Sequence, residues 1–475
     1  MLVVTASGLR WALVRGCWYR SRVTAPNDTI FALSSGRPPA AIAVVRLSGP
    51  RARAALEALI GRVPEPRKAA LANVRDPASG EAIDQALTLW FPAPRSETGE
   101  DVAELQLHGG RAVVAAVLAV LGRIPGLRMA EPGEFTRRAF EHGQLDLTQV
   151  EALADLIGAE TEAQRRQALQ QMRGLLGDRA EDWRTRVIEA LAQVEAAIDF
   201  ADEGDVPTNL MTRALAIARP LADEISAALA GAERGERLRD GLWVVIAGPP
   251  NAGKSTLLNR IAKREAAIVS PIAGTTRDVI EVHLDLNGYP VNLIDTAGIR
   301  ESSDDPVERE GMRRAREQAA RANLVLWVVD ATAADATPPP LAPGVMRWTV
   351  LNKMDVVRPQ ELPRLEWQFK AKGDAHLISA TTGAGFELLM DAIVAFAERY
   401  FTLEPALVTR ERQRKVLVGV VQSIVVSAKL AEQGAGEELV AEQLRLAASG
   451  LGRLTGRVDV EDILEVIFRD FCIGK

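Results

Sequence analysis

The sequence predicts a multidomain protein that combines α/β and all-α parts. At 475 residues the chain is too long for one hydrophobic core, and its length favours roughly three domains. Strand-like and helix-like segments alternate over residues 241–398, which is typical of a parallel sheet with helices on both faces. Helical patterns fill residues 144–240 and 399–475. We therefore expect one helical domain, split in sequence, with an α/β domain inserted into it and a further domain at the N-terminus.

The N-terminal segment, residues 25–143, mixes short strands with helices and is expected to form an α+β domain. Residues 42–47 and 87–91 are strand-like, and residues 102–108 alternate apolar and polar side chains as a half-buried strand does. Residues 112–121 have a helical pattern.

Residues 1–24 differ from the rest of the chain. They carry four arginines, no acidic residue and no clean hydrophobic run, a composition that a transit peptide also has. We instead expect a disordered extension or a start codon assigned too far upstream, because ordered-looking sequence begins only near Asn27.

The two helical segments carry apolar stripes that are typical of packing faces. Apolar side chains recur there every three or four residues. They are Trp183, Val187, Leu191, Val194, Ile198, Leu221, Ile225 and Leu229 in the first segment, and Leu417, Val421 and Ile424 in the second. Helices from both segments are expected to pack into one bundle.

The inserted segment contains five strand-like runs. They are residues 242–247, 291–294, 324–329, 348–352 and 375–379. The first leads into Gly-Pro-Pro-Asn-Ala-Gly-Lys-Ser at 248–255 and then a helix-like segment, which is the context of a phosphate-binding loop. Backbone N–H groups of such a loop surround a triphosphate. Lys254 can reach the outer phosphates, and the Ser255 hydroxyl can ligate Mg²⁺.

Four further motifs follow in the order of a GTPase domain. They are Thr275-Thr276, Asp295-Thr296-Ala297-Gly298, Asn352-Lys353-Met354-Asp355 and Ser379-Ala380. The Asp355 carboxylate can accept hydrogen bonds from N1–H and the amine of guanine, which adenine does not offer. Asn352 is expected at the other edge of the base, and the Ala380 N–H at its carbonyl oxygen. The inserted segment is thus predicted to be a P-loop, Ras-like G domain with GTP as its substrate.

Two loops are expected to respond to the γ-phosphate. Thr276 can close over it and give Mg²⁺ a second hydroxyl ligand, Asp295 would hold the metal through water, and the Gly298 N–H would sense the phosphate. Ile299 stands where many GTPases carry a glutamine that orients the attacking water, so either hydrolysis is slow or another group positions the water. Glu308 is the candidate for that role.

Composition excludes several classes of protein. No stretch approaches the ~20 apolar residues that span a bilayer, so no membrane partner is expected. A net charge of −6 argues against a globally basic nucleic-acid surface. Cys17 and Cys472 lie at opposite ends and give neither a disulfide framework nor a zinc spacing, which indicates a reducing, cytoplasmic compartment. The histidines lie far apart and predict no metal site.

Beyond the G-domain motifs, the chain resembles the MnmE/TrmE family of tRNA-modification GTPases. The resemblance rests on residues 42–50 (IAVVRLSGP), 98–105 (TGEDVAEL), 131–140 (EPGEFTRRAF) and 145–149 (LDLTQ), and on the tail Phe471-Cys472-Ile473-Gly474-Lys475. These blocks occur in family order over residues 27–475, and only residues 1–24 fall outside.

The resemblance implies a homodimer built on N-terminal domains that have a folate-binding fold similar to folate-dependent aminomethyltransferases. Family members act with the FAD-dependent partner MnmG, in a heterotetramer, on the wobble uridine of certain tRNAs. They install an aminomethyl or carboxymethylaminomethyl group, with the one-carbon unit taken from 5-formyltetrahydrofolate or a related tetrahydrofolate. Their G domains pair when GTP binds, and K⁺ at the interface stimulates hydrolysis.

The same resemblance assigns individual residues in the G domain. Asn251 would ligate K⁺ together with Ser270, Ile272 and Thr275, and the cation would do the work of an arginine finger. Glu308 matches the glutamate that positions the attacking water through a second water. The expected Mg²⁺ ligands are Ser255 and Thr276. The expected GTP-binding residues are Asn251, Ala252, Gly253, Lys254, Ser255, Thr256, Ser270, Pro271, Ile272, Ala273, Gly274, Thr275, Thr276, Asp295, Thr296, Ala297, Gly298, Asn352, Lys353, Asp355, Ser379 and Ala380.

The resemblance also assigns a folate site. Arg46 and Glu104 match family contacts to folate, Glu104 at the amino-amide edge of the pterin, and Lys475 matches the C-terminal end of the pocket. Gln144 stands where a basic residue is usual in the family, so a charge interaction with folate is expected to be missing. Cys472 matches a tail cysteine implicated in the modification chemistry, and a buried small residue is the alternative.

Two other hypotheses remain open. A GTP-dependent assembly or signalling switch, such as a ribosome-biogenesis factor, shares the G-domain motifs, but the sequence shows no RNA-binding module beside the G domain. The other is a family relative that kept its GTPase and dimer functions and lost folate use, for which Gln144 is the only indication.

Overall fold

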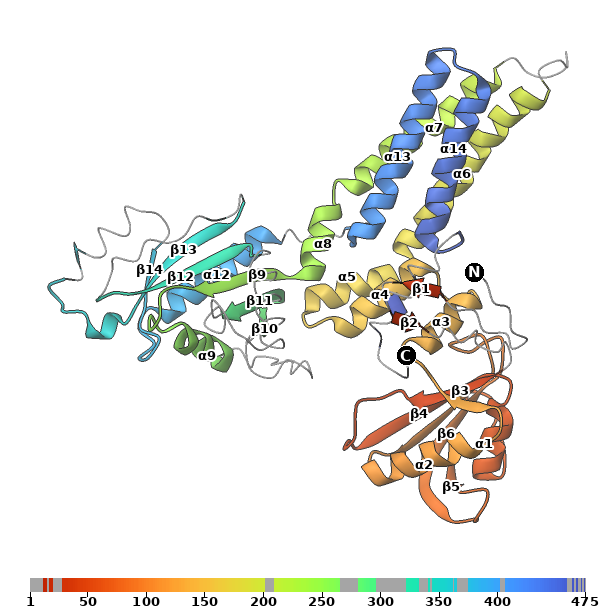
Figure 1. Ribbon diagram of the computed structural model, residues 1–475, viewed down its shortest axis with the longest axis horizontal. Coiled ribbons are helices and arrows are strands. Elements are labelled where there is room, and N and C mark those ends of the chain that lie inside the picture. The colour runs from red at the N-terminus through yellow and green to blue at the C-terminus, as the bar shows by residue number, and fades with distance from the viewer. Residues whose placement is uncertain are drawn as a thin grey trace. The chain divides into compact units, whose positions relative to one another are not determined.

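The computed structural model describes residues 12–14, 17–19, 28–200, 209–264, 281–295, 322–332, 341, 344–361, 363–364, 375–401, 406–458, 464, 467–468, 471 and 474 (Figure 1). The chain divides into two compact units: residues 1–150 with 459–475, and residues 151–458. Within the described ranges, no helix combines the length and apolar character that a membrane crossing requires.

The first unit is built on a six-stranded sheet with strand order β5-β6-β7-β4-β3-β8. Its strands are β3 (Thr29–Leu33), β4 (Ile42–Ser48), β5 (Ala70–Arg75), β6 (Ala82–Phe91), β7 (Val102–His108) and β8 (Leu127–Met129). The pair β3–β8 is parallel and the other neighbours are antiparallel. The runs predicted at 42–47, 87–91 and 102–108 lie in β4, β6 and β7 and are confirmed.

Helices of this unit pack on both faces of β3. Helices α1 (Ala52–Ile60) and α2 (Arg111–Arg123) share a core with Phe31 of β3. Helix α3 (Glu134–Glu141) places Phe135 against Ile30 and Ala32 of the same strand. Because successive side chains of a strand point to opposite faces, α3 covers the face that α1 and α2 leave.

The C-terminal tail belongs to this first unit, whereas the sequence indicated that residues 399–475 form one helical segment. Helix α14 (Glu437–Thr455) ends at Gly456, which has a φ of 88°. That left-handed conformation stops the helix and lets the chain leave the bundle. Phe468 and Phe471 are buried, and a Cβ on Gly133 would lie 2.8 Å from the Phe468 carbonyl oxygen.

Two short strands lie in the segment that was expected to be a disordered extension. β1 (Ala12–Val14) and β2 (Cys17–Tyr19) form an antiparallel pair. The prediction for residues 1–24 rested on their arginines and on the absence of a clean hydrophobic run, so it did not include this strand pair. Aromatic and β-branched residue types in the segment do favour strand conformation.

The second unit contains a bundle made from both sides of the inserted segment. Helices α6 (Leu175–Asp199), α7 (Leu210–Leu229), α13 (Glu411–Glu432) and α14 share one apolar core. The core includes Trp183, Val187, Leu221, Ile225, Leu417, Ile424, Leu444 and Leu451, each at most 1% exposed. The predicted split helical domain is therefore confirmed. Helices α4 (Leu147–Gly158) and α5 (Glu162–Met172) precede the bundle, and α8 (Ala232–Asp240) leads out of it.

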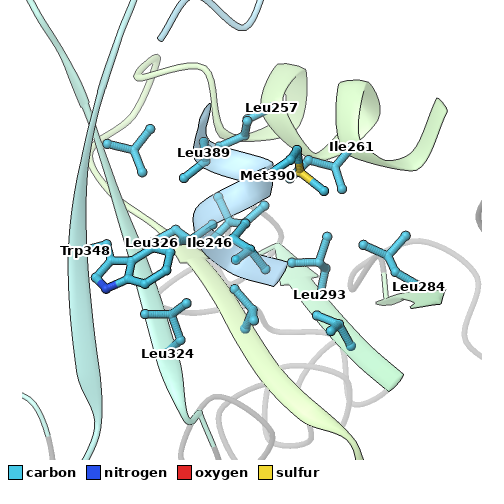
Figure 2. Packing of buried hydrophobic residues seen from close by; sticks show 14 of the residues in the cluster. Ile246, Leu257, Ile261, Leu284, Leu293, Leu324, Leu326, Trp348, Leu389 and Met390 are labelled. Atoms are coloured by element: carbon cyan, nitrogen blue, oxygen red, sulfur yellow. The ribbon is translucent and has the colours of Figure 1, made fainter. Parts of the chain in front are cut away.

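The inserted segment forms a second six-stranded sheet, with order β10-β11-β9-β12-β13-β14. Its strands are β9 (Leu242–Ala247), β10 (Glu281–Leu286), β11 (Tyr289–Asp295), β12 (Leu324–Asp330), β13 (Met346–Asn352) and β14 (Ala375–Leu377). The five predicted strands correspond to β9, β11, β12, β13 and β14. Helices α9 (Lys254–Arg264) and α12 (Phe386–Tyr400) pack with Leu326 and Trp348 on one face (Figure 2).

The predicted parallel sheet differs from the observed one at one edge. β10 runs antiparallel to β11, and Asn287-Gly288 joins the two with both residues at positive φ, 55° and 89°. Asn-Gly between alternating runs is a strong hairpin signal, because only such residues adopt the tight turn at little cost. This signal is present in the sequence, although the five predicted strands did not include β10.

Candidate functional site

The phosphate-binding loop joins β9 to α9, and its glycines are required by close packing. Gly248 has a φ of 149° and Gly253 a φ of 93°. A Cβ on Gly248 would overlap the Val328 carbonyl oxygen of β12, and one on Gly253 would overlap the Asn352 side-chain nitrogen. The loop therefore lies directly on the sheet, with the N-terminus of α9 ready to receive an anion.

Lys254, the first residue of α9, is folded back over this loop. Its Nζ donates hydrogen bonds to the carbonyl oxygens of Gly248 and Pro249, each 2.9 Å long. These bonds hold the ammonium group where it can neutralise phosphate charge. Within the loop Ala252 is buried, whereas Asn251 and, on α9, Thr256 are exposed.

Ser255, one of the two expected Mg²⁺ ligands, meets Asp295, which is expected to hold the metal through water, beside the loop. Ser255 Oγ donates to Asp295 Oδ2 at 2.9 Å, and Asp295, at the C-terminal end of β11, is 3% exposed. A hydroxyl and a carboxylate are oxygen donors of the kind that Mg²⁺ takes in phosphate sites. These residues therefore fit the metal.

On the base side, Asn352 joins two loops instead of facing only the nucleotide. Its Nδ2 donates to the Ala252 carbonyl oxygen at 2.8 Å, and its Oδ1 accepts from the Ala380 N–H at 2.8 Å. The side chain is 2% exposed. The sequence analysis gave Asn352 a contact with the base and did not foresee that it ties the phosphate loop to the Ala380 loop.

The other base-side residues are fixed by local bonds. Lys353, at a φ of 65°, donates from Nζ to Asp330 Oδ2 at 2.7 Å. Burial alone would raise the pKa of Asp330, but the bonds from Lys353 and Thr332 hold it below its ordinary value. Ser379 is fully buried and accepts from the Thr382 N–H at 3.0 Å. Asp355 is exposed on a 3-10 turn, Met354–Val356, where its carboxylate is open to a ligand.

Several expected site residues lie outside the described residues. They are Ser270, Pro271, Ile272, Ala273, Gly274, Thr275, Thr276, Thr296, Ala297, Gly298, Glu308, Cys472 and Lys475. Ile299 lies outside them as well.

In the first unit, the sheet brings Arg46 and Glu104 together. They are direct partners across β4 and β7, and Arg46 bonds Glu104 Oε1 through Nε at 2.9 Å and through Nη2 at 2.8 Å. Arg46 also pairs with Glu97 and lies 5.9 Å from the ring centroid of Phe135. Each side chain of the Arg46–Glu104 pair is 17% exposed, so the carboxylate is oriented and still reachable.

One further folate candidate, Gln144, and the neighbour of another can be located relative to this pair. Gln144 is exposed, and a Cβ on Gly99 would lie 3.3 Å from its Nε2, which places the amide beside the loop that carries Glu97. Gly474 lies tightly against the Leu33 carbonyl oxygen at the end of β3, the strand next to β4. The residue before Lys475 thus lies one strand away from Arg46.

The sequence analysis missed a charged network that supports this region. Arg138, 9% exposed, bonds Asp28 Oδ1 at 2.6 Å and Glu100 Oε2 at 3.0 Å. Arg128 bonds Asp28 at 2.5 Å and also pairs with Glu134. The hydrogen bonds that Arg128 donates to Glu134 raise the pKa of Arg128 above its ordinary value. The signal was the high density of polar residues after position 128, more than a core element needs.

Comparison with known proteins finds a family model for each of two parts of the chain. The family model described as the N-terminus of the GTP-binding protein TrmE matches residues 29–144, and that of the MnmE helical domain matches residues 147–472. The tRNA modification GTPase MnmE of Bradyrhizobium sp. (strain ORS 278) is 58% identical over 452 residues, covering 95% of this chain and 100% of the relative. The protein of that name from Rhodopseudomonas palustris (strain BisB18) is 58% identical over 456 residues, covering 94% and 99%. The chain therefore belongs to the MnmE family of tRNA modification GTPases.

Proposed function

We propose that this protein uses GTP hydrolysis to drive modification of C5 of the tRNA wobble uridine. The group added is aminomethyl or carboxymethylaminomethyl, and MnmG is the partner. The observation that carries the proposal is the Ser255–Asp295 contact beside the phosphate loop, in a chain that belongs to a family of tRNA modification GTPases. That contact brings two oxygen donors for Mg²⁺ to the place where a triphosphate would end.

In this proposal the chain's own groups bind and polarise GTP. Loop N–H groups and Lys254 would hold the β- and γ-phosphates. Ser255 and Thr276 would hold Mg²⁺, which would supply positive charge beside the phosphates. Asp355 selects guanine. Glu308 positions the attacking water, which Ile299 has no polar group to do.

A potassium ion completes the proposed GTPase site. Asn251, exposed on the phosphate loop at a φ of 60°, presents an amide oxygen of the kind that K⁺ takes. Ser270, Ile272 and Thr275 would supply the remaining ligands, and a bound K⁺ would offset charge that develops between the β- and γ-phosphates. We expect GTP turnover to fall strongly when Na⁺ replaces K⁺, and unchanged turnover would remove Asn251 from this role.

The folate part of the proposal rests on Arg46 and Glu104. Arg46 orients the Glu104 carboxylate, which can accept two hydrogen bonds from the amino-amide edge of a pterin such as that of 5-formyltetrahydrofolate. Lys475 and Gln144 complete the pocket, and Cys472 takes part in the modification chemistry. We propose a cytoplasmic homodimer, formed through the N-terminal domains, that binds MnmG.

The decisive test is mass spectrometry of tRNA from a strain that lacks this protein. We expect wobble uridines without the C5 group, restored by the wild-type gene and not by S255A or E308A. A GTP-dependent assembly switch is the second candidate, and it predicts normal wobble uridines with altered ribosome assembly. Normal uridines in the deletion strain would overturn the proposal.

A further inference from the structure

Arg260 lies on α9, about one and a half turns after the phosphate loop, and reaches across to the loop that carries Ala380. Its Nε donates to the Ala380 carbonyl oxygen and its Nη2 to the Thr381 carbonyl oxygen, both at 2.6 Å. The planar guanidinium thus binds two consecutive backbone carbonyl oxygens at once, a geometry that the ammonium group of a lysine cannot provide.

The guanidinium is itself held in place. It lies over the Phe386 ring at 5.7 Å from the centroid, and Phe386 is buried at the start of α12. A Cβ on Gly383 would lie 2.5 Å from Nη1, so the turn that follows Thr381 closes on the guanidinium. This packing already restricts the rotamers of Arg260. The two hydrogen bonds to the carbonyl oxygens therefore cost little further side-chain entropy.

The Ala380 loop is therefore fixed from two sides. Asn352 Oδ1 accepts from the Ala380 N–H, and Arg260 donates to the carbonyl oxygens that follow. The single hydrogen of this N–H would be shared between Asn352 Oδ1 and the carbonyl oxygen of guanine in a three-centre bond. The bond to guanine weakens steeply when the donor moves or tilts.

We propose that Arg260 is a positioning residue that sets the affinity and base selectivity of the site by holding the Ala380 loop. The inference rests on the proposed use of GTP at this site. It goes beyond it by assigning part of guanine recognition to a residue of α9 that lies outside the sequence motifs.

The test uses competition of fluorescent methylanthraniloyl-GDP by three nucleotides on the full-length protein. GDP carries both the base carbonyl and the 2-amine, IDP carries only the carbonyl, and the diphosphate of 2-aminopurine riboside carries only the amine. R260A should weaken GDP and IDP by the same factor, about 5- to 10-fold, which is the loss expected for about one hydrogen bond. Binding of the 2-aminopurine nucleotide should stay within about twofold, because it offers the Ala380 N–H no carbonyl.

The matched control is Arg264, one turn further along the same helix. Its guanidinium lies over the same Phe386 ring at 6.0 Å and pairs with Glu387 at 2.6 Å. R264A removes the same charge and a contact with the same ring, and we expect it to leave the three affinities unchanged. R260K should fall between R260A and wild type, and KM for GTP should rise more than kcat falls.

Two results would overturn the inference. One is an R260A protein that matches R264A and wild type for all three nucleotides. The other is an equal loss for all three, which would mean that Arg260 only supports folding. Wild-type protein that fails to prefer GDP over ADP in the same assay would instead contradict the proposed GTP site.

Discussion

Backbone groups form most of the GTP site, whereas side chains form most of the candidate folate site. Around the phosphate loop, carbonyls and N–H groups are brought together because Gly248 and Gly253 have no Cβ, and single side chains tie the loops. Around Arg46, ion pairs between side chains of different strands and helices set the geometry. A site built from the backbone of one loop can be recognised in the sequence as a compact motif. A site built from ion pairs appears in the sequence only as charged residues far apart from one another.

The largest expected effect lies in the ion-pair network of the first unit. R138L should lower the free energy of unfolding of this unit by ~3–5 kcal/mol, because the poorly solvated Glu100 carboxylate would lose its arginine partner and Asp28 would keep only Arg128. Urea unfolding, read by hydrogen exchange of the β3 and β4 amides, measures this unit separately. R137L is the control, since neighbouring Arg137 is 48% exposed and pairs with exposed Glu141. A loss in R138L no larger than the few tenths of a kcal/mol expected for R137L would contradict the comparison.

A smaller effect is expected from the backbone of the GTP site. G253A should lower GTP affinity by about 100-fold, or ~2.7 kcal/mol, because its Cβ would displace Asn352 and the residue would be strained at positive φ. Isothermal titration with a non-hydrolysable GTP analogue and Mg²⁺ measures the loss. G288A tests strain alone, because Gly288 has a φ of 89° and no atom within 4 Å of its Cβ position. Equal affinities for the two variants would mean that the close approach to Asn352 does not matter.

A substitution in the Arg46–Glu104 pair should affect the candidate folate site and leave the GTP site unchanged. E104Q should weaken binding of 5-formyltetrahydrofolate by about 10-fold, because a charge-assisted pair of bonds becomes neutral, and GTP hydrolysis should not change. Equilibrium dialysis and a phosphate-release assay give the two numbers. E97Q removes the more exposed partner of Arg46 and should have a smaller effect on folate. Loss of GTP turnover in E104Q would show that the sites are not separable in this way.

The smallest effect concerns acid stability of the base side of the GTP site. The pKa of Asp330 is lowered in the folded state, so its stabilisation is present above the unfolded pKa and is lost as pH falls through the folded value. We expect less than ~1 kcal/mol, since the pair with Lys353 is partly exposed. Urea midpoints between pH 3 and 6 should fall less steeply in D330N than in wild type, with D355N as an exposed control. Parallel curves for D330N and wild type would exclude the contribution.

Local patterns predicted much of the fold and of the GTP site. Apolar periodicity located β4, β7, β9 and the bundle stripes, because burial of one face imposes a period on the sequence. The phosphate loop was readable because its glycines, Lys254 and Ser255 are neighbours in the chain. The hairpin at Asn287-Gly288 was readable too, and it was missed only because its strand was not sought.

Other features depend on contacts between residues far apart in sequence. No local pattern shows that Asn352 bonds Ala252, that Arg260 grips residues 380–381, or that Arg138 meets Asp28. The return of the tail to β3 is of the same kind, because it depends on where Gly474 can approach Leu33.

The sequence by itself determined the identity of the chemical groups: a phosphate loop, a guanine-reading motif and a chain built from three kinds of domain. It could do so because bond-level chemistry and hydrophobic period are local properties. Only the tertiary structure decided which side chains hold those groups still. Hydrogen bonds and ion pairs act over about 3 Å in space and take no account of distance along the chain, so their partners appear only when the chain is folded.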